Sequence, residues 1–571
     1  MASENMMSEC AERIISEDYA DFIIEIGFRE NEARQEYKDL CIQDIGYKFS
    51  AIYYPLSEIN PISVGEDTYI AIPKLFGLMD TSAVEATGAL RLQRVRGTSL
   101  TGNGVIVGFI DTGIDYTNDI FKNVTGRTRI LSIWDQSDQS GTHPQGIEFG
   151  SEYTREDIDR ALQSENPYSI VPTKDTQGHG TFMAGVACGS EDVENNFIGA
   201  ANESQIAVVK LKKAKKYLRN FYLIEENVQD VYQENDIMQA VTYLRNLSRR
   251  ESKPLVLVLG LGTGSGQRSG GSALSQQLND LGEMIGCCVV TCAGNEGNAR
   301  LHYKGSVLNK EYEDVELRVG EGTNGFTMEL WGNSPDIISV AFISPSGEMI
   351  SRIPARVGQS DTVEFLLEKS KIDISYSLVE AGGGVELIFM RFIDPTPGVW
   401  IIRVYGNNIL EGDYNIWLPI KQFIDKETYF LKPNPDITLT VPSTTQATIT
   451  VAAYDNMTNA LFTDSSRGFT RTNEIKPDIT APGVNVYGPG INNNYVRKSG
   501  TSVAAALVAG NCAQLMQWGI VEKNETQMKT NYIKNFLIRG AIRDRNIVYP
   551  SKEWGYGKVN VYEAFSILRN K

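Results

Sequence analysis

The sequence predicts an α/β protein with a doubly wound parallel sheet, a small α+β unit before it and an all-β unit inserted into it. The sheet is predicted from aliphatic runs without polar alternation, because strands buried on both faces of a parallel sheet are apolar throughout. These runs are Val105–Ile110, Ile206–Leu211, Leu255–Leu259, Cys287–Cys292 and Thr448–Ala453. Helical patterns separate the runs, and strands alternating with helices indicate the α/β class.

Residues 1–80 are expected to form the α+β unit. Glu30–Cys41 has a helical pattern, and three segments have the β-branched and aromatic content of strands. The predicted strands are Ala20–Ile26, Phe49–Pro55 and Thr68–Pro73. A linker around Lys74–Asp80 follows. Thr81–Thr87 is then expected to start a helix, because Ser82 and Glu85 have the spacing of a capping box.

The α/β domain is expected in two parts, residues 81–300 and 441–571. Within the first part, Asp236–Arg249 carries apolar residues at the spacing of one helix face. They are Ile237, Ala240, Val241, Leu244 and Leu247. This segment is therefore predicted to be an amphipathic helix.

Residues 301–440 interrupt the alternation with short strand-like segments separated by glycine and proline. Examples are Phe326–Trp331, Ile338–Ile343, Val385–Phe389, Val399–Tyr405 and Tyr414–Leu418. Regular short strands with such turn signals predict a β-sandwich or jelly roll. Because α/β-type strands resume near residue 446, we expect this β unit to be an insertion.

Composition excludes several functional classes. The 571 residues carry 54 basic and 71 acidic side chains, a net charge of −17, which disfavours binding to nucleic acid or anionic membranes. No run approaches the length of a membrane span, so no transmembrane helix is expected. Met1–Ser16 lacks a basic segment followed by an apolar run, so we expect no secretory signal and synthesis in the cytoplasm. The basic run Lys210–Lys216 is expected to be a solvated loop.

Cysteine and histidine usage argues against disulfides and metals. The seven cysteines are few and odd in number, which predicts no disulfide framework and fits a reducing compartment. The three histidines form no HExxH motif or Cys/His cluster, and no aspartate-rich loop is typical of calcium binding. We therefore expect neither a metal nor a cofactor.

Three short motifs carry residue types suited to nucleophilic catalysis. Asp111 ends an aliphatic run in IDTGID (110–115), where α/β sheets place ligands. His179 lies between two glycines, which allow close backbone approach, and opens an amphipathic run, Phe182–Cys188. Ser502, in SGTS, begins a helix of small residues whose N-terminal N–H groups and dipole would favour an oxyanion.

Each motif alone has an ordinary structural explanation. Asp111 could be a turn or cap residue, His179 a structural histidine, and the threonine and serine before the helix an N-cap. The combination in the order Asp, His, Ser is far more specific than any one of the motifs.

These segments resemble the catalytic blocks of the subtilisin-like serine proteases (subtilases, peptidase family S8). DTGID, GHGTFMAG and GTSVAAALVAG match the three blocks, AGNEG (293–297) resembles the block with the oxyanion-hole asparagine, and Ile475–Gly483 resembles the block before the serine. The resemblance implies that Ser502 is the nucleophile, His179 the general base and Asp111 the residue that orients the imidazole. Asn295 would stabilise the oxyanion.

The same resemblance places Gly260, Leu261 and Gly262 along an extended peptide substrate, paired with it as a β-strand. Gly260 replaces the serine of many relatives, which leaves the specificity at the scissile bond open. Val503 and Leu507 replace the usual methionine and proline, and neither is a reacting group.

Three further polar residues are expected to take no part in catalysis. Asp115 should serve as a structural hydrogen-bonding residue. His143 and His302 should be bystanders, because nothing in the sequence places either beside a nucleophile.

The long spacings between motifs and the β insert resemble the clostridial Csp germination proteases, and the complete triad resembles their active, CspB-like type. The resemblance implies a spore-associated enzyme whose protein substrate is the proenzyme of a cortex-degrading hydrolase. Residues 1–80 would be a propeptide that assists folding, is cut between residues 77 and 82, and stays as an inhibitory partner.

The sequence leaves open alternative roles for the N-terminal unit, for the β insert and for the chain as a whole. The first 80 residues could be a permanently attached domain, and the β insert could rigidify the protease or bind a partner. The chain as a whole could be a subtilase of another role, or a non-catalytic pseudoprotease that regulates or binds.

Overall fold

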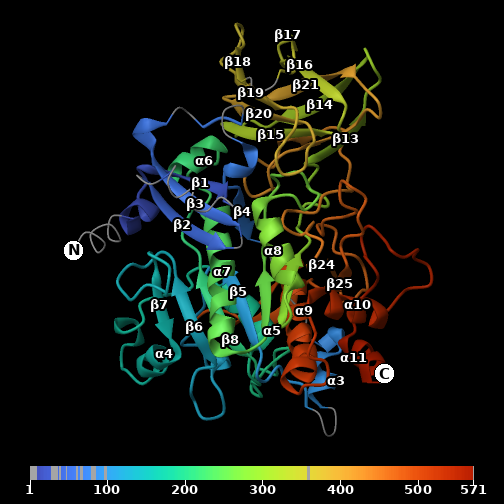
Figure 1. Cartoon of the computed structure of the whole chain (residues 1–571). Coiled ribbons are helices and arrows are strands. Elements are labelled where there is room, and N and C mark those ends of the chain that lie inside the picture. Colours follow the sequence, from blue (N-terminus) through green and yellow to red (C-terminus); the bar gives the residue numbers. More distant parts are fainter. Residues whose placement is uncertain are drawn as a thin grey trace.

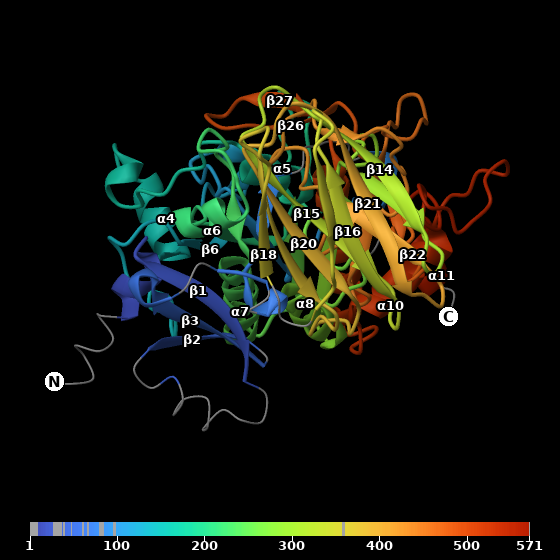
Figure 2. The ribbon, with the colours of Figure 1, turned by 90° about the horizontal axis from the view of Figure 1, so that it is seen from above.

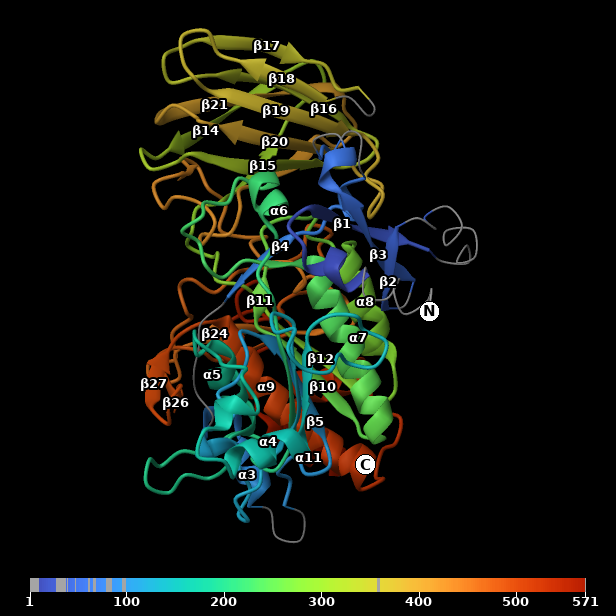
Figure 3. The same ribbon diagram turned by 90° about the vertical axis from the view of Figure 1, so that its left-hand side faces the viewer.

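Figure 1 shows the computed structural model of the chain, which describes residues 10–569 except 27–36, 38–39, 47, 60–61, 65–67, 79–84, 95–98 and 357–359. An α/β domain forms one end of the molecule, and the inserted β unit forms the other. The N-terminal sheet lies beside the α/β domain, next to its long helix (Figure 3).

The centre of the α/β domain is an eight-stranded sheet in the order β25-β24-β12-β10-β5-β8-β6-β7. Its strands are β5 (Ile106–Asp111), β6 (Ile130–Asp135), β7 (Ser151–Thr154), β8 (Gln205–Lys210), β10 (Leu255–Leu259), β12 (Cys287–Cys292), β24 (Ile449–Tyr454) and β25 (Ile479–Pro482). Every pair is parallel except β6 with β7. The five aliphatic runs all fall on strands of this sheet, which confirms the predicted α/β class with a mixed, largely parallel sheet.

Helices cover both faces of the sheet, which explains why its strands are apolar on both sides. Val107 and Phe109 pack in the cluster that contains α5 (His179–Cys188) and α9 (Thr501–Met516). Ile106 and Ile110 point to the opposite face and pack in the cluster that contains α7 (Glu234–Glu251) and α8 (Ala273–Glu283). The predicted helix Asp236–Arg249 lies within α7. The remaining helices of the domain are α3 (Ala89–Gln93), α4 (Arg155–Leu162), α6 (Lys216–Phe221), α10 (Thr530–Gly540) and α11 (Val561–Arg569).

Two helices that carry candidate site residues are buried all round. Each of the ten residues of α5 is buried, so the amphipathic pattern expected for Phe182–Cys188 is wrong: α5 crosses the core between the sheet and its neighbours. The helical stretch Thr501–Val521, which contains α9, is long and apolar enough to cross a membrane by length and composition, with a mean hydropathy of 1.2. Of the 18-residue segment that gives this hydropathy, 89% is buried inside the structure, as in the core helix of a folded domain.

The N-terminal unit is an antiparallel sheet in the order β1-β3-β2, with β1 at Tyr19–Glu25, β2 at Cys41–Gly46 and β3 at Phe49–Pro55. Phe49 and Tyr53 pack in the same hydrophobic cluster as α7, so the unit shares its core with the α/β domain. The expected strand at Thr68–Pro73 is wrong. Tyr69–Ala71 is a 3-10 turn and the strand β4 is Leu75–Leu78; in the turn, the carbonyls of Tyr69 and Ile72 accept hydrogen bonds from the buried Lys74 Nζ instead of from a neighbouring strand. The predicted helix Glu30–Cys41 and the capping box of Ser82 and Glu85 lie largely outside the described residues.

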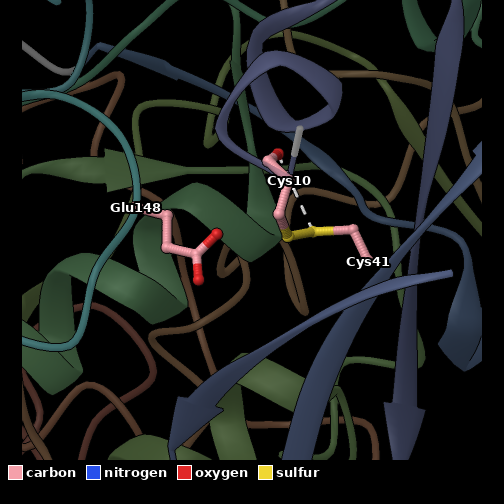
Figure 4. Close-up of side chains that lie close together, drawn as sticks. All are labelled: Cys10, Cys41 and Glu148. Atoms are coloured by element: carbon pink, nitrogen blue, oxygen red, sulfur yellow. Dashed lines mark hydrogen bonds between the residues drawn. A yellow bond between two sulfur atoms is a disulfide. The ribbon is translucent and has the colours of Figure 1, made fainter. Parts of the chain in front are cut away.

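A disulfide joins Cys10 to Cys41, which corrects the expectation of none. Composition misled here because an overall cysteine count carries no information about a pair that folding brings together. Figure 4 shows Glu148 beside this disulfide. Among the described residues, these three form the one cluster of possible metal ligands, and the disulfide uses both sulfurs.

The inserted unit consists of two antiparallel sheets that enclose their own core around Trp400, Phe392 and Ile374. The first sheet has the order β13-β22-β15-β20-β19-β18 and the second the order β17-β16-β21-β14-β23. Their strands are β13 (His302–Ser306), β14 (Tyr312–Val319), β15 (Gly325–Gly332), β16 (Ile337–Ile343), β17 (Met349–Ile353), β18 (Ser360–Glu364), β19 (Lys371–Ser377), β20 (Leu387–Ile393), β21 (Gly398–Asn408), β22 (Asp413–Trp417) and β23 (Tyr429–Phe430). Figure 2 shows strands of both sheets running side by side over the α/β domain.

The basic run Lys210–Lys216 is not a solvated loop. Lys210 pairs with Asp135 at 2.9 Å, Lys212 with Asp236 at 2.6 Å, and Lys215 with Asp21 at 2.5 Å. The three acidic side chains are almost completely buried and require nearby positive charge. The run therefore neutralises buried carboxylates, one of which belongs to the N-terminal unit.

Candidate active site

The structure brings Asp111, His179 and Ser502 together from three separate elements. Asp111 is the last residue of β5, His179 the first of α5 and Ser502 the second of α9. His179 Nδ1 lies 2.7 Å and 2.9 Å from the two carboxylate oxygens of Asp111, and its Nε2 lies 3.2 Å from Ser502 Oγ. All three distances are within hydrogen-bonding reach, so the imidazole links an acid on one side to a hydroxyl on the other.

The glycines beside the histidine allow its helix to start against the aspartate loop. A Cβ at residue 180 would lie 2.1 Å from the carbonyl oxygen of Gly113, which no side chain can tolerate. Gly178 has φ +73°, a left-handed conformation that favours glycine. The GHG pattern is therefore a packing requirement as well as a way to position His179.

Asp175 fixes the position of the histidine helix relative to the aspartate strand. Its carboxylate accepts hydrogen bonds from Thr181 N at 2.9 Å, Thr181 Oγ1 at 2.7 Å, Gly178 N at 2.8 Å and Thr112 Oγ1 at 2.9 Å. Thr112 Oγ1 in turn accepts from Gly180 N at 3.0 Å. Sequence reasoning missed Asp175, although an acidic residue four positions before the histidine was a usable signal.

Asn295 lies beside the start of the serine helix. Its Oδ1 accepts hydrogen bonds from Thr501 N and Thr501 Oγ1, both at 3.1 Å. Because the amide oxygen is turned to Thr501, the Nδ2 group is the donor end that remains for other partners. The Asn295 amide and the backbone N–H of Ser502 therefore lie at the same end of α9, where the helix dipole favours negative charge.

Gly260, Leu261 and Gly262 lie along a segment of the chain itself. Strand β11 (Leu261–Gly262) pairs antiparallel with β4, with Leu261 opposite Leu78 and Gly262 opposite Gly77. Strand β9 (Tyr232–Gln233) pairs with the same β4 at Phe76 and Leu75. Figure 3 shows β4 and β11 between the inserted sheets and the α/β domain. An extended segment of the N-terminal unit therefore lies between two strands of the domain.

Gly260, the residue before β11, lies against Ser502 and His179. A Cβ at Gly260 would lie 3.2 Å from Ser502 Cβ and 3.3 Å from His179 Cε1, so the residue beside β11 lies directly against the catalytic-type pair. Ser502 is 0% exposed and His179 3% exposed. The hydroxyl is thus enclosed in this structure, and β4 pairs with the strand that follows Gly260.

The other polar residues singled out from the sequence have structural surroundings. Asp115 accepts hydrogen bonds from Thr117 N and Oγ1 and from Asn492 N. His143 Nδ1 contacts the carbonyl of Gly150 at 2.6 Å. His302 is in β13 of the insert, stacks on Trp417, and burial lowers its pKa to about 4.

Comparison with known proteins points to one family. A family model described as the Subtilase family matches residues 102–356 and 398–557. The chain is 23% identical over 532 residues to the PII-type proteinase of Lacticaseibacillus paracasei, covering 82% of this chain and 26% of that protein. It is 24% identical over 511 residues to the C5a peptidase of Streptococcus pyogenes, covering 81% of this chain and 39% of that protein. The chain thus spans about a quarter to two fifths of the length of these relatives.

The chain is also similar to a solved structure over most of its length. The structure of the CspB protease of Clostridium perfringens matches with a TM-score of 0.75 and 32% sequence identity, covering 85% of this chain and 98% of that chain. The extent of the family match and this structural likeness lead to one conclusion: the chain belongs to the Subtilase family.

Proposed function

We propose that the chain is a serine endopeptidase that uses Ser502, His179 and Asp111. The observation that carries this proposal is the continuous Asp111–His179–Ser502 hydrogen-bonded line. Ser502 Oγ attacks the scissile carbonyl while His179 Nε2 takes its proton, and the same imidazole later protonates the leaving amine. Asp111 holds the imidazole with Nδ1 protonated and stabilises the imidazolium.

The oxyanion of the tetrahedral intermediate would be held by Asn295 Nδ2 and the backbone N–H of Ser502. The N-terminus of α9 adds a favourable dipole at the same place. A peptide substrate would occupy the position beside β11 that β4 occupies in this structure; we call this position the substrate track. Main-chain hydrogen bonds there would align the peptide and bring its scissile carbonyl to Ser502.

We propose that residues 1–80 are a propeptide that the enzyme cuts itself. Support comes from β4, because Leu75–Leu78 pairs as a substrate strand would with β11, the strand that follows Gly260 beside Ser502. The expected cut lies between residues 77 and 82, and residues 79–82 are outside the described part of the chain. The cleaved unit would remain as an inhibitor, held by the core it shares with α7.

The test of both proposals uses the wild type, Ser502→Ala and the matched control Ser499→Ala, three residues away. Intact-mass analysis should show a cut between residues 77 and 82 in the wild type and the control, and an uncut Ser502→Ala chain. A fluorophosphonate probe should label Ser502 in the first two proteins. A folded wild type that is neither cut nor labelled would favour the pseudoprotease alternative.

For the natural substrate we propose the proenzyme of a cortex-degrading hydrolase, in a spore-associated setting. This proposal rests on the layout that the chain shares with the Csp germination proteases. Incubation of the wild type and Ser502→Ala with spore extract, followed by sequencing of new N-termini, tests it. New termini confined to other proteins would assign the enzyme a different role.

A further inference from the structure

Lys74 is buried where the N-terminal unit, the α/β domain and the β insert meet. Its side chain is 2% exposed, and Nζ donates hydrogen bonds to the carbonyls of Tyr69 at 2.6 Å and Ile72 at 2.8 Å. Nζ also lies 4.3 Å from the centre of the Tyr69 ring. A buried ammonium group requires compensating negative charge, so the surrounding carboxylates become informative.

Glu234 of α7 contacts both the main chain and the side chain of residue 74. Its backbone N donates to the Lys74 carbonyl at 2.9 Å, and its Oε2 accepts from Lys74 N at 3.2 Å. The same Oε2 lies 3.9 Å from Lys74 Nζ, and Oε1 accepts from Leu274 N at 3.1 Å. Glu234 is thus fixed in place, fully buried, and faces whatever residue occupies position 74.

The β insert contributes two further buried carboxylates, Glu329 and Glu380, each 3% exposed. Glu329 is held by Gly266 N and by Trp331 Nε1, both at 2.9 Å, and accepts a hydrogen bond from the Tyr69 hydroxyl. Burial lowers the pKa of Lys74, and the charges of Glu234, Glu380 and Glu329 oppose that change. The lysine therefore lies in a negative field built jointly by the α/β domain and the insert.

The position of Lys74 is tied to the substrate track. It directly precedes β4, and Leu78 of β4 lies opposite Leu261. Any peptide that follows the same track therefore places a side chain at the position of Lys74, four residues before the one opposite Leu261. An uncharged side chain there would remove the ammonium group beside the buried carboxylate of Glu234, which is unfavourable.

We infer that this junction is a subsite for a lysine side chain, with Glu234 as its specificity-determining residue and Glu329 and Glu380 of the insert completing its charge. The substrate class is then extended peptides with a lysine four residues before the residue opposite Leu261. Lys74 is the first occupant, and the insert has a part in substrate selection. This inference rests on the proposed endopeptidase function.

The test follows self-cleavage of the full chain by intact mass during refolding. Lys74→Gln and Glu234→Gln should each slow the cut by about 10- to 100-fold, because each leaves a buried charge uncompensated. Lys74→Arg keeps the charge and should remain within about threefold of the wild type. The double variant should be faster than the product of the two single effects predicts, because the two residues act as a pair. Lys48→Gln is the matched control, since its ion pair with Glu25 is exposed.

Each outcome separates this inference from the proposed function. An uncut wild type would overturn the endopeptidase proposal itself. A wild type that is cut, with Lys74→Gln cut equally fast or Lys74→Arg as slow as Lys74→Gln, would overturn the subsite alone. Folding is checked by thermal unfolding of each variant in the Ser502→Ala background. Should Lys74→Gln fail to fold, cleavage of Glu234→Gln at the wild-type rate would overturn the subsite.

Discussion

Asp21 anchors the N-terminal unit to the α/β domain through a single buried carboxylate. The side chain is 0% exposed and accepts hydrogen bonds from Lys215 Nζ at 2.5 Å, Gln233 Nε2 at 2.7 Å and Asn235 Nδ2 at 3.0 Å. Lys215 is itself 3% exposed. Replacing Asp21 by asparagine would therefore leave the lysine charge buried without its partner.

Removing one partner of a buried ion pair costs about 3–5 kcal/mol. Hydrogen–deuterium exchange of the full chain, in the Ser502→Ala background, measures this cost locally, because amides of β1 and β3 exchange when the unit opens. Asp21→Asn should lower their protection by about 10²- to 4 × 10³-fold, since each factor of ten corresponds to about 1.4 kcal/mol. Amides of β10 in the central sheet should be unaffected.

Glu25→Gln provides the matched control on the same strand. Its partner Lys48 lies 2.8 Å away, and the two side chains are 52% and 30% exposed, so the pair should contribute at most about 1 kcal/mol. The double variant Asp21→Asn/Lys215→Met should recover part of the lost protection, because it removes the orphaned charge. Equal protection in Asp21→Asn and Glu25→Gln would refute the anchoring role.

Three further predictions concern the site and the insert. Gly260→Ala should slow fluorophosphonate labelling by about 10- to 100-fold with an unchanged circular dichroism spectrum, because its Cβ would press on Ser502 and His179; labelling at the wild-type rate would contradict this. Asp111→Asn should slow self-cleavage by about 10⁴-fold through the wrong histidine tautomer, with a smaller loss counting against the triad. Burial raises the pKa of Glu386 from 4.5 to about 8, so the folded state binds the proton more tightly and stability is lost as pH rises from 4.5 to 8. Glu386→Gln should therefore gain thermal stability relative to wild type between pH 5 and 8.5, and a gain independent of pH would disprove the titration.

Local sequence patterns predicted the central sheet because strands buried on both faces consist almost entirely of apolar residues. Each of the five aliphatic runs became a strand, since alternating residues of one strand enter two different cores. The candidate site was predictable because Asp111, His179 and Ser502 each lie in a short motif, and the three motifs in this order resemble one family; for His179, close contacts require the flanking glycine at residue 180.

The features that the sequence did not predict share a physical cause. Pairing of Cys10 with Cys41 and of Lys215 with Asp21 depends on which distant segments meet, and neither a cysteine count nor a charge run contains that information. The spacing of Asp175 from His179 was a usable signal, but the groups that its carboxylate binds are set by the tertiary contacts with Thr112 and Thr181.

The amino-acid sequence by itself determined the α/β class, the inserted strands and the three motifs, because periodicity and local backbone demands act over a few neighbouring residues. Only the tertiary structure decided that Leu75–Leu78 occupies the track beside β11 and that Lys74 meets carboxylates from two other parts of the chain. Such contacts between segments distant in sequence depend on burial and charge over the whole molecule, and local sequence patterns do not contain that information.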